Sequence, residues 1–233
     1  MLYIVPTPVG NLEDITLRAL RVLKEVDLIL AEDTRTSKKL LQHYDINTPL
    51  RSHHAHNENK AAEALVEQLQ GGLTMALISD AGTPGISDPG YSLIKACVTA
   101  SVKIECLPGA TAIIPALVAS GLPCNRFYFE GFLPHKKGRQ TRLNVLAELA
   151  CTFALYESPH RLEKCISQLI SVCGAQRKAV VCRELSKMYE EYYRGSLLDI
   201  QQALLNNQLK SKGEIVVVVE AKPKEKKQKK YNS

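Results

Sequence analysis

The chain has 233 residues, of which 45% are hydrophobic and 23% are charged, a composition typical of a folded globular protein with one large domain or two small ones. Its apolar runs are too short to span a bilayer, and its first residues lack a basic segment followed by a long apolar stretch. Composition therefore excludes an integral membrane protein and a secretory leader, and predicts a soluble cytoplasmic protein.

The formal net charge of +6 comes mostly from one end of the chain. Residues 221–233 contain six lysines and one glutamate, so the rest of the chain is nearly neutral. We expect these residues to form a basic disordered tail, with attraction of RNA as an alternative use. The seven cysteines are odd in number and scattered without a CxxC pair, which indicates reduced thiols in a reducing compartment.

Short β-rich runs alternate with helical patterns through the first half of the chain. The expected strands are 2–6, 27–32, 74–79 and 103–107. The expected helices are 16–25, 34–44, a helix that ends at 70, 89–100 and 111–120. The polar stretch 47–58 is assigned no strand. This alternation predicts a mainly parallel sheet with crossover helices in an α/β domain over residues 1–121.

The segment GLPCN at 121–125 separates this half from the next, in which strands and helices no longer alternate regularly. The expected strands are 126–132, 151–156, 179–185, 190–195 and 214–220, and the expected helices are 139–149, 159–172 and 197–207. Because some strands follow one another directly, we expect a mixed sheet in a second α/β domain over residues 122–220.

Three loops of small residues follow strands of the first half. The fingerprints GxGxxG, GxxxxGK[ST], HExxH and GxSxG are absent, so dinucleotide, P-loop, zincin and hydrolase functions lack their signatures. The segment SDAGTPGISDPG at 79–90 follows a buried-looking strand, where ligands bind in open α/β sheets. A ligand-facing role for Asp80 and Thr83 competes with a plain tight turn, and Asp88 is expected to be an N-cap. With the loops 6–11 and 108–112, this segment predicts one shared pocket rim.

The second half places polar side chains after two strands. Ser158 before Pro159 is expected to be an N-cap, which leaves Glu157, His160 and Arg161 available for function. The segment 183–187 carries both charge signs at a strand end, where a local ion pair is the alternative to a functional role. The histidines at 53, 54 and 56 lack a matching acid or thiol at ligand spacing, so we expect a polar loop and no metal.

The motifs together resemble a known family. They are TPVGNLEDITLRAL, AEDTR, SDAGTPGISDPG, ASGLP, FEGFLP, YESPHR, REL and GEIVVVVE, within residues 2–220. On these residues the chain resembles the ribosomal RNA small subunit methyltransferase I family of the tetrapyrrole methylase superfamily. The resemblance implies a two-domain α/β tetrapyrrole-methylase-like fold that binds S-adenosylmethionine in the cleft between its domains, without a metal, as a homodimer.

The resemblance also implies an activity and a cofactor site. The activity is methylation of the ribose 2′-hydroxyl of a cytidine in the decoding region of small-subunit (16S) ribosomal RNA, with S-adenosylhomocysteine as the second product. Carried over by position, the cofactor contacts are Pro8, Asp80, Thr83, Ile86, Thr111, Ala112 and Tyr156. The alternatives are a superfamily methyltransferase that acts on a tetrapyrrole or a protein side chain, and an RNA- or nucleotide-binding protein without catalysis.

The expected reaction assigns further residues. Methyl transfer from a sulfonium is an in-line displacement, so positioning dominates, with a base to take the hydroxyl proton and a cation to stabilise the oxyanion. Glu184 is the candidate base and Lys187 the candidate cation or base. Expected contacts with the small-subunit RNA are Arg35, His54, His56, Lys136, Lys137, Arg139 and Arg161. Tyr156 is a candidate to stack on a splayed base. For 135–142, the solvated start of a helix is the alternative.

Overall fold

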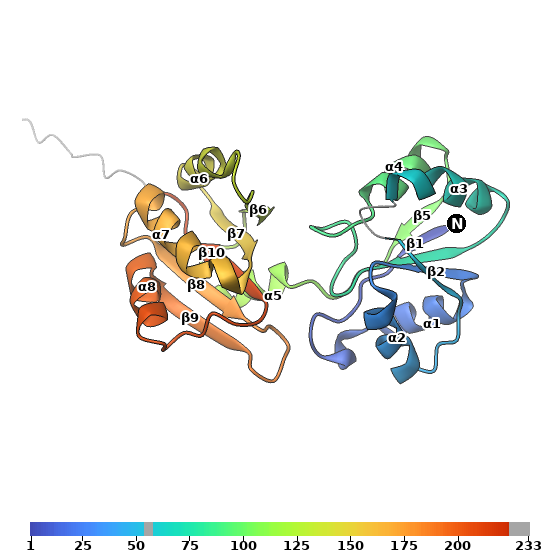
Figure 1. The fold of residues 1–233 in the computed structure, drawn as a ribbon, viewed down its shortest axis with the longest axis horizontal. Coiled ribbons are helices and arrows are strands. Elements are labelled where there is room, and N and C mark those ends of the chain that lie inside the picture. The colour runs from blue at the N-terminus through green and yellow to red at the C-terminus, as the bar shows by residue number, and fades with distance from the viewer. Residues whose placement is uncertain (54–57, 224–233) are drawn as a thin grey trace, which may run out of the picture. The chain divides into compact units, whose positions relative to one another are not determined.

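The first half of the chain folds as a five-stranded parallel sheet covered by helices on both faces (Figure 1). The computed structural model describes residues 1–53 and 58–223, with backbone alone for 58–61. The strands are β1 (Leu2–Ile4), β2 (Leu28–Ala31), β3 (Leu50–Ser52), β4 (Met75–Ile78) and β5 (Ile104–Cys106), in the spatial order β3-β2-β4-β1-β5. The helices are α1 (Leu17–Glu25), α2 (Thr34–His43), α3 (Glu58–Gln70) and α4 (Tyr91–Thr99), with a 3₁₀ turn, η1 (Leu12–Asp14).

Alternate side chains of the strands pack into two separate hydrophobic cores, one on each face of the sheet. On the face covered by α1 and α2, Leu23 and Leu41 pack with Ile29. On the face covered by α3 and α4, Leu65 and Leu93 pack with Leu77. Each fully buried leucine or isoleucine contributes about 1.5–3 kcal/mol, so the two-sided burial fixes which way each strand faces.

Two local predictions for the first half were wrong. The stretch 47–58 contains the strand β3, which pairs with β2 at the sheet edge and is partly or fully exposed, so no apolar pattern announces it. Helix α4 has Gly90 (φ 135°) at its N-cap position instead of Asp88. A Cβ at Gly90 would lie 2.9 Å from Cδ2 of Leu77, so the chain passes tightly over β4 before the helix begins.

The second half forms a mixed sheet, as expected. Its strands are β6 (Phe127–Phe132), β7 (Thr152–Glu157), β8 (Lys178–Arg183), β9 (Glu191–Ser196) and β10 (Ile215–Val219), in the order β6-β7-β10-β8-β9. Among the described strands of this second sheet, only β6 and β7 pair in parallel. The helices are α5 (Ile113–Ser120), α6 (Arg139–Ala147), α7 (Leu162–Cys173) and α8 (Leu197–Leu205), with a 3₁₀ turn, η2 (Pro159–Arg161). Ser158 occupies the N-cap position of η2, without a side-chain capping bond.

Helices cover both faces of this second sheet as well. Helices α6, α7 and α8 lie on one face (Figure 1), where Leu146, Ile166 and Leu204 share a core with Phe153 and Val217. Helix α5 packs against β8, β9 and β10 on the opposite face (Figure 1).

The chain divides into two compact units, Met1–Ala112 and Ile113–Ser233. Helix α5 groups with the second unit because it packs on that unit's sheet, whereas the sequence placed the boundary near residue 122. The domain limits 1–121 and 122–220 stay a prediction, and the expected tail lies mostly outside the described residues.

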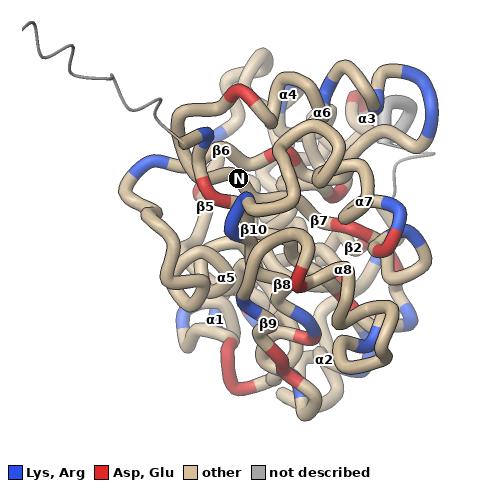
Figure 2. The backbone as a smooth tube through the Cα atoms, turned by 90° about the vertical axis from the view of Figure 1, so that its left-hand side faces the viewer, with Lys and Arg blue, Asp and Glu red and all other residues tan. Residues whose placement is uncertain are grey.

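Charges of both signs are spread along the chain, as Figure 2 shows. This distribution agrees with a nearly neutral body. Within the described residues, no helix has the length and apolar character needed to cross a membrane.

Candidate active site

The carboxyl ends of the parallel strands meet at one edge of the first sheet. Strand β4 lies between β2 and β1. The chain leaves β1 and β2 toward α1 and α2 on one face, whereas it leaves β4 toward α4 on the other (Figure 1). Loops that diverge in this way mark a topological switch point, where open α/β sheets bind their ligands.

Hydrogen bonds join the three small-residue loops at this edge. Thr7 and Gly82 exchange two backbone hydrogen bonds of 2.9 Å. The hydroxyl of Thr7 donates to the carbonyl of Ser79 at 2.9 Å, and that of Thr83 donates to the carbonyl of Ala110 at 3.1 Å. The loops after β1, β4 and β5 are therefore one connected structure.

Glycines permit this close assembly. Gly82 has φ +80°, a left-handed conformation that glycine adopts without steric cost. A Cβ at Gly109 would lie 2.7 Å from Cβ of Pro6, so a side chain there would separate the loops after β1 and β5. Both glycines therefore allow the three loops to lie in direct contact at the carboxyl edge of the sheet.

Asp80 stands at the end of β4 and is held by the neighbouring strand end. Its Oδ1 accepts a hydrogen bond of 3.1 Å from the backbone amide of Asp33. Partial desolvation and the nearby Asp33 carboxylate raise the pKa of Asp80 above its usual value. As a carboxylate, Asp80 accepts hydrogen bonds, so it suits the hydroxyl or amine groups of a ligand.

Asp33 was not among the residues singled out from the sequence. Its carboxylate accepts three hydrogen bonds from the Arg35 side chain, two from Nε at 3.1 and 3.2 Å and one from Nη2 at 2.7 Å. It also caps α2. The bonds from Arg35 lower the pKa of Asp33 to about 2. The Arg35 side chain is 88% exposed, so its outer face stays open to an anion. The sequence signal that could have identified Asp33 is the segment AEDTR, in which an N-cap residue directly follows an expected strand.

The other expected cofactor residues of the first unit lie on the same loops. Pro8 is buried, Thr83, Thr111 and Ala112 are half-buried, and Ile86 is exposed.

One edge of the second sheet collects the expected residues of that unit. Tyr156 pairs with Phe132, and Ile215 pairs with both Glu157 and Arg183. The ring of Tyr156 lies 5.5 Å from that of Phe132. The ends of β7 and β8 therefore flank the start of β10, and the end of β6 lies beside that of β7. Glu184 directly follows β8.

Glu184 and Lys187 form an ion pair that includes Glu214. Oε1 of Glu184 accepts hydrogen bonds from the backbone amide of Glu214 at 2.8 Å and from Nζ of Lys187 at 3.1 Å. Lys187 Nζ is also 3.0 Å from Oε1 of Glu214. The Glu214 amide, helped by Lys187, lowers the pKa of Glu184. Burial disfavours the Lys187 charge, but its bonds to the two carboxylates outweigh burial and raise its pKa. This geometry favours Lys187 as a cation and Glu184 as the group that positions it.

Two of the expected RNA contacts, Arg139 and Arg161, form ion pairs with the buried carboxylate of Glu157. Arg139 is 5% exposed, and its Nη2 donates to Glu157 at 2.9 Å. Its Nε donates to Gln168 at 2.8 Å. The Nη2 of Arg161 lies 2.8 Å from the other carboxylate oxygen of Glu157. The Arg139–Glu157 pair holds the start of α6 against the end of β7. The Arg139 side chain is 6% exposed and that of Arg161 is 21% exposed, so Arg161 keeps part of its surface in solvent.

The remaining RNA candidates fall into two groups. Lys136 and Lys137 are exposed in the loop before α6. His54 and His56 lie outside the described residues. Within residues 1–53 and 58–223, no group of three metal-binding side chains occurs.

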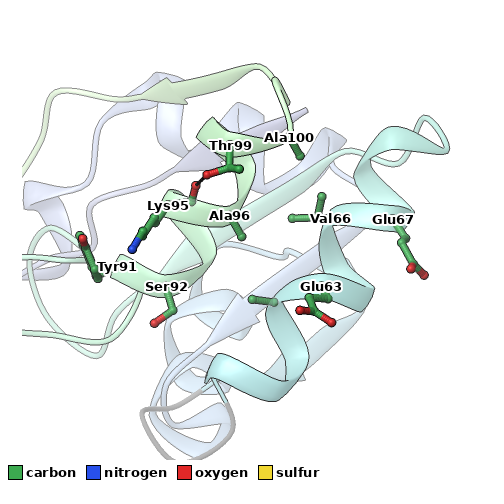
Figure 3. Close-up of a pocket in the computed structure, with 10 residues that line it drawn as sticks. Glu63, Val66, Glu67, Tyr91, Ser92, Lys95, Ala96, Thr99 and Ala100 are labelled. Atoms are coloured by element: carbon green, nitrogen blue, oxygen red, sulfur yellow. Dashed lines mark hydrogen bonds between the residues drawn. The ribbon is translucent and has the colours of Figure 1, made fainter.

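An open groove of about 760 Å³ lies between α3 and α4 (Figure 3). Glu63, Glu67, Tyr91 and Lys95 supply most of its polar groups. In Figure 3, Tyr91 and Lys95 lie at one end and Glu67 at the other, so no set of groups converges on a ligand. We therefore place the candidate active site at the strand ends and not in this groove.

Comparison with known proteins agrees with this fold. Residues 1–201 match the family of Tetrapyrrole (Corrin/Porphyrin) Methylases. The ribosomal RNA small subunit methyltransferase I of Haemophilus influenzae is 48% identical over 96% of this chain and 80% of its own length. A uroporphyrin-III C-methyltransferase from Thermus thermophilus, solved in complex with S-adenosylhomocysteine, has a TM-score of 0.65 at 17% identity, over 94% of this chain and 96% of its own. A diphthine synthase has a TM-score of 0.70 at 13% identity, over 94% of this chain and 89% of its own.

A parallel sheet with a loop-built switch-point site, followed by a mixed sheet, is thus the fold of a tetrapyrrole-methylase-type methyltransferase. Identities of 13% and 17% to the solved structures show only the fold. Identity of 48% over nearly the whole chain is far more specific. The chain belongs to the ribosomal RNA small subunit methyltransferase I family.

Proposed function

We propose that this protein uses S-adenosylmethionine to methylate the ribose 2′-hydroxyl of a cytidine in the decoding region of small-subunit ribosomal RNA. The observation that carries the proposal is the near-complete match to relatives named for small-subunit ribosomal RNA methylation. The same fold holds S-adenosylhomocysteine in a solved uroporphyrin-III methyltransferase, which supports the cofactor.

The cofactor contacts are proposed on the joined loops of the first unit and on β7. Asp80 accepts hydrogen bonds from ligand hydroxyl or amine groups, while the backbone near Gly82 and Thr83 lies against the nucleoside. When bound, S-adenosylmethionine supplies an electrophilic methyl group. The contact residues are Pro8, Asp80, Thr83, Ile86, Thr111, Ala112 and Tyr156.

Lys187 is the proposed electrostatic catalyst. Its raised pKa keeps it protonated at neutral pH, so it can stabilise the negative charge that develops on the ribose oxygen. Glu184 holds Lys187 in place through the 3.1 Å bond, and its lowered pKa makes it a weak proton acceptor. Positioning of the hydroxyl therefore carries more of the catalysis than proton removal does.

For the RNA, we propose phosphate contacts from the exposed cations. These are Arg35, held by Asp33, and Lys136 and Lys137 before α6; His54 and His56 remain sequence predictions. The homodimer and the cytoplasmic location implied by the family resemblance also remain predictions.

The decisive experiment is transfer of labelled methyl from S-adenosylmethionine to small ribosomal subunits from a strain that lacks this enzyme, with nuclease mapping of the label. We expect the label on a 2′-O-methylated cytidine. Lys187→Gln should lower kcat by about 10²–10³-fold, as for loss of an oxyanion-hole donor. The control is Lys164→Gln, at an exposed position of α7, which should leave transfer unchanged. No label on subunits, with S-adenosylhomocysteine bound, would contradict the proposal and direct the search toward tetrapyrroles and proteins.

A further inference from the structure

Strand β6 ends in a bulge that turns Phe132 outward. Phe129 pairs with Ala154 and Phe132 pairs with Tyr156, so β6 has one residue more than β7 between these two pairs. Gly131 within this interval has φ +69°, a conformation that glycine adopts without strain. Bulges of this kind re-aim a side chain and are frequent beside active sites.

The outward turn leaves a large aromatic ring in solvent at the functional edge. Phe132 is 53% exposed, although burying a phenylalanine is favourable by about 1.5–3 kcal/mol. Its ring lies 5.5 Å from that of Tyr156, which in turn contacts Phe129 at 5.0 Å. Phe132 is thus the open end of a row of three aromatic rings that supports it from one side.

The chain that continues from Phe132 is basic. His135, Lys136 and Lys137 are exposed, and residues 132–138 contain no acidic side chain. The nearest acid along the strand, Glu130, is bound to Arg142 at 2.7 Å. An exposed aromatic ring beside cations that lack acidic neighbours in the sequence suits a nucleic acid, in which bases stack on the ring and phosphates meet the cations.

We propose that Phe132 is a stacking platform for an unpaired nucleobase of the RNA substrate, with Lys136 and Lys137 holding the flanking phosphates. The inference rests on the proposed function and deepens it. It assigns Phe132, which lies next to Tyr156, as the residue that holds a base flipped out of the RNA helix. A second copy of this chain fits the patch less well, since a two-fold contact centred there would bring the basic loops of both copies together.

Substitutions at Phe132 separate stacking from packing. Phe132→Ala should weaken binding of single-stranded RNA by about 5–150-fold, the range measured for loss of one base–aromatic stack. Phe132→Leu keeps an apolar side chain without a ring face, so it should behave like the alanine variant, whereas Phe132→Tyr should bind like the parent protein. In all three variants, S-adenosylhomocysteine affinity should change far less than RNA affinity, because Phe132 reaches the proposed cofactor contacts only through the ring of Tyr156. Normal RNA binding by the leucine variant would overturn the proposal.

The absence of tryptophan from the chain provides a direct spectroscopic test. Phe132→Trp introduces a single indole, and stacking of a base on it should quench its fluorescence. The matched control is Phe127→Trp, at the opposite end of β6, where the side chain is 41% exposed. The probe is a single-stranded oligoribonucleotide of mixed sequence, compared with a duplex of the same length and with S-adenosylhomocysteine.

We expect the single strand to quench the indole at position 132 more than the duplex does, and to leave the indole at position 127 unchanged. RNA binding without quenching at position 132, no binding of single-stranded RNA, or quenching only by S-adenosylhomocysteine or by raised protein concentration would each overturn the inference. The readout needs no methyl transfer. Failure of the proposed function would instead appear as absence of label on small subunits with the quenching intact.

Discussion

The backbone amide of Asp33 donates a 3.1 Å hydrogen bond to the carboxylate of Asp80. This bond joins the ends of two adjacent strands, β2 and β4, at the point where their following helices diverge to opposite faces of the sheet. Since the side chain of Asp33 also holds Arg35, one residue fixes both a proposed cofactor contact and a proposed RNA contact. Asp33 therefore links the proposed cofactor contact Asp80 to the proposed RNA contact Arg35 at the switch point.

The first prediction concerns Asp80. Asp80→Asn keeps the size of the side chain but removes its charge, and should weaken S-adenosylhomocysteine binding by about 10–100-fold, the value of a charge-assisted hydrogen bond. In the parent protein, affinity should fall as the pH drops through the pKa of Asp80, which lies above the usual 3.8, because the protonated acid accepts hydrogen bonds less well. Calorimetry across this pH range measures both effects.

The control for this experiment is Asp45→Asn. Asp45 lies in the turn after α2 with φ +51°, a conformation that asparagine tolerates. It should leave affinity and its pH dependence unchanged. An Asp80→Asn variant that binds as tightly as the parent, with the same pH profile, would remove Asp80 from the cofactor site.

A second prediction follows from the contact between Gly213 and Glu184. A Cβ at Gly213 would lie 2.3 Å from Cδ of Glu184, so Gly213→Ala should displace the carboxylate that positions Lys187. We expect slower methyl transfer with unchanged S-adenosylhomocysteine affinity. Steady-state kinetics with small subunits gives kcat and KM separately, and the loss should fall on kcat.

Gly174→Ala is the matched control for this substitution. Gly174 has φ 88° and ψ 147°, a backbone region that glycine adopts far more readily than alanine, and a Cβ at this position would meet no atom within 4 Å. Gly174→Ala therefore introduces backbone strain without any contact at Glu184. Only Gly213→Ala should slow the reaction. Equal rates for the two variants would show that the position of Glu184 does not matter for catalysis.

The sequence predicted the first half of the site better than the second. The loops 6–11, 79–90 and 108–112 were expected to share one rim because the carboxyl ends of parallel strands meet at one edge, and hydrogen bonds through Thr7 and Thr83 join them. That rule needs only strand order along the chain. It does not depend on the partner of any single side chain.

The partners of individual charged residues were not predictable in this way. Arg139 follows two lysines and a glycine, a pattern typical of a surface, yet it is buried against Glu157. Glu184 is bound by the backbone of Glu214, 30 residues away, which only the pairing of β10 with β8 brings near. A buried ion pair and a surface ion pair consist of the same residue types, so only the tertiary structure distinguishes them.

A third prediction tests the buried cluster around Glu157. Its side chain is fully buried and shared between Arg139 and Arg161. Glu157→Ala should lower the free energy of unfolding by about 3–5 kcal/mol, because it leaves buried guanidinium groups without their counter-charge. Urea unfolding measures the change, and Glu163→Ala, at an exposed position of α7, should stay within about 0.5 kcal/mol of the parent.

A double variant separates lost pairing from lost packing at this cluster. Glu157→Leu combined with Arg139→Met replaces two of the charges by apolar groups of similar size, so it should be less destabilised than Glu157→Ala alone. A double variant at least as unstable as the alanine variant would mean that the paired charges themselves stabilise the fold and that apolar packing of similar size does not replace them.

The last prediction concerns the lysine-rich end of the chain. Lys222 belongs to the folded unit, because its amide donates to the carbonyl of Leu149 at 2.8 Å and its Nζ lies 2.6 Å from Glu148. Truncation after Pro223 therefore removes most of the tail lysines and keeps these contacts. If the tail attracts RNA phosphates, the truncated protein should bind small-subunit RNA more weakly at low salt, and the two proteins should converge as salt is raised, because counterion release drives such binding. Filter binding across a salt series measures the slope for each protein, and identical slopes would show that the tail takes no part.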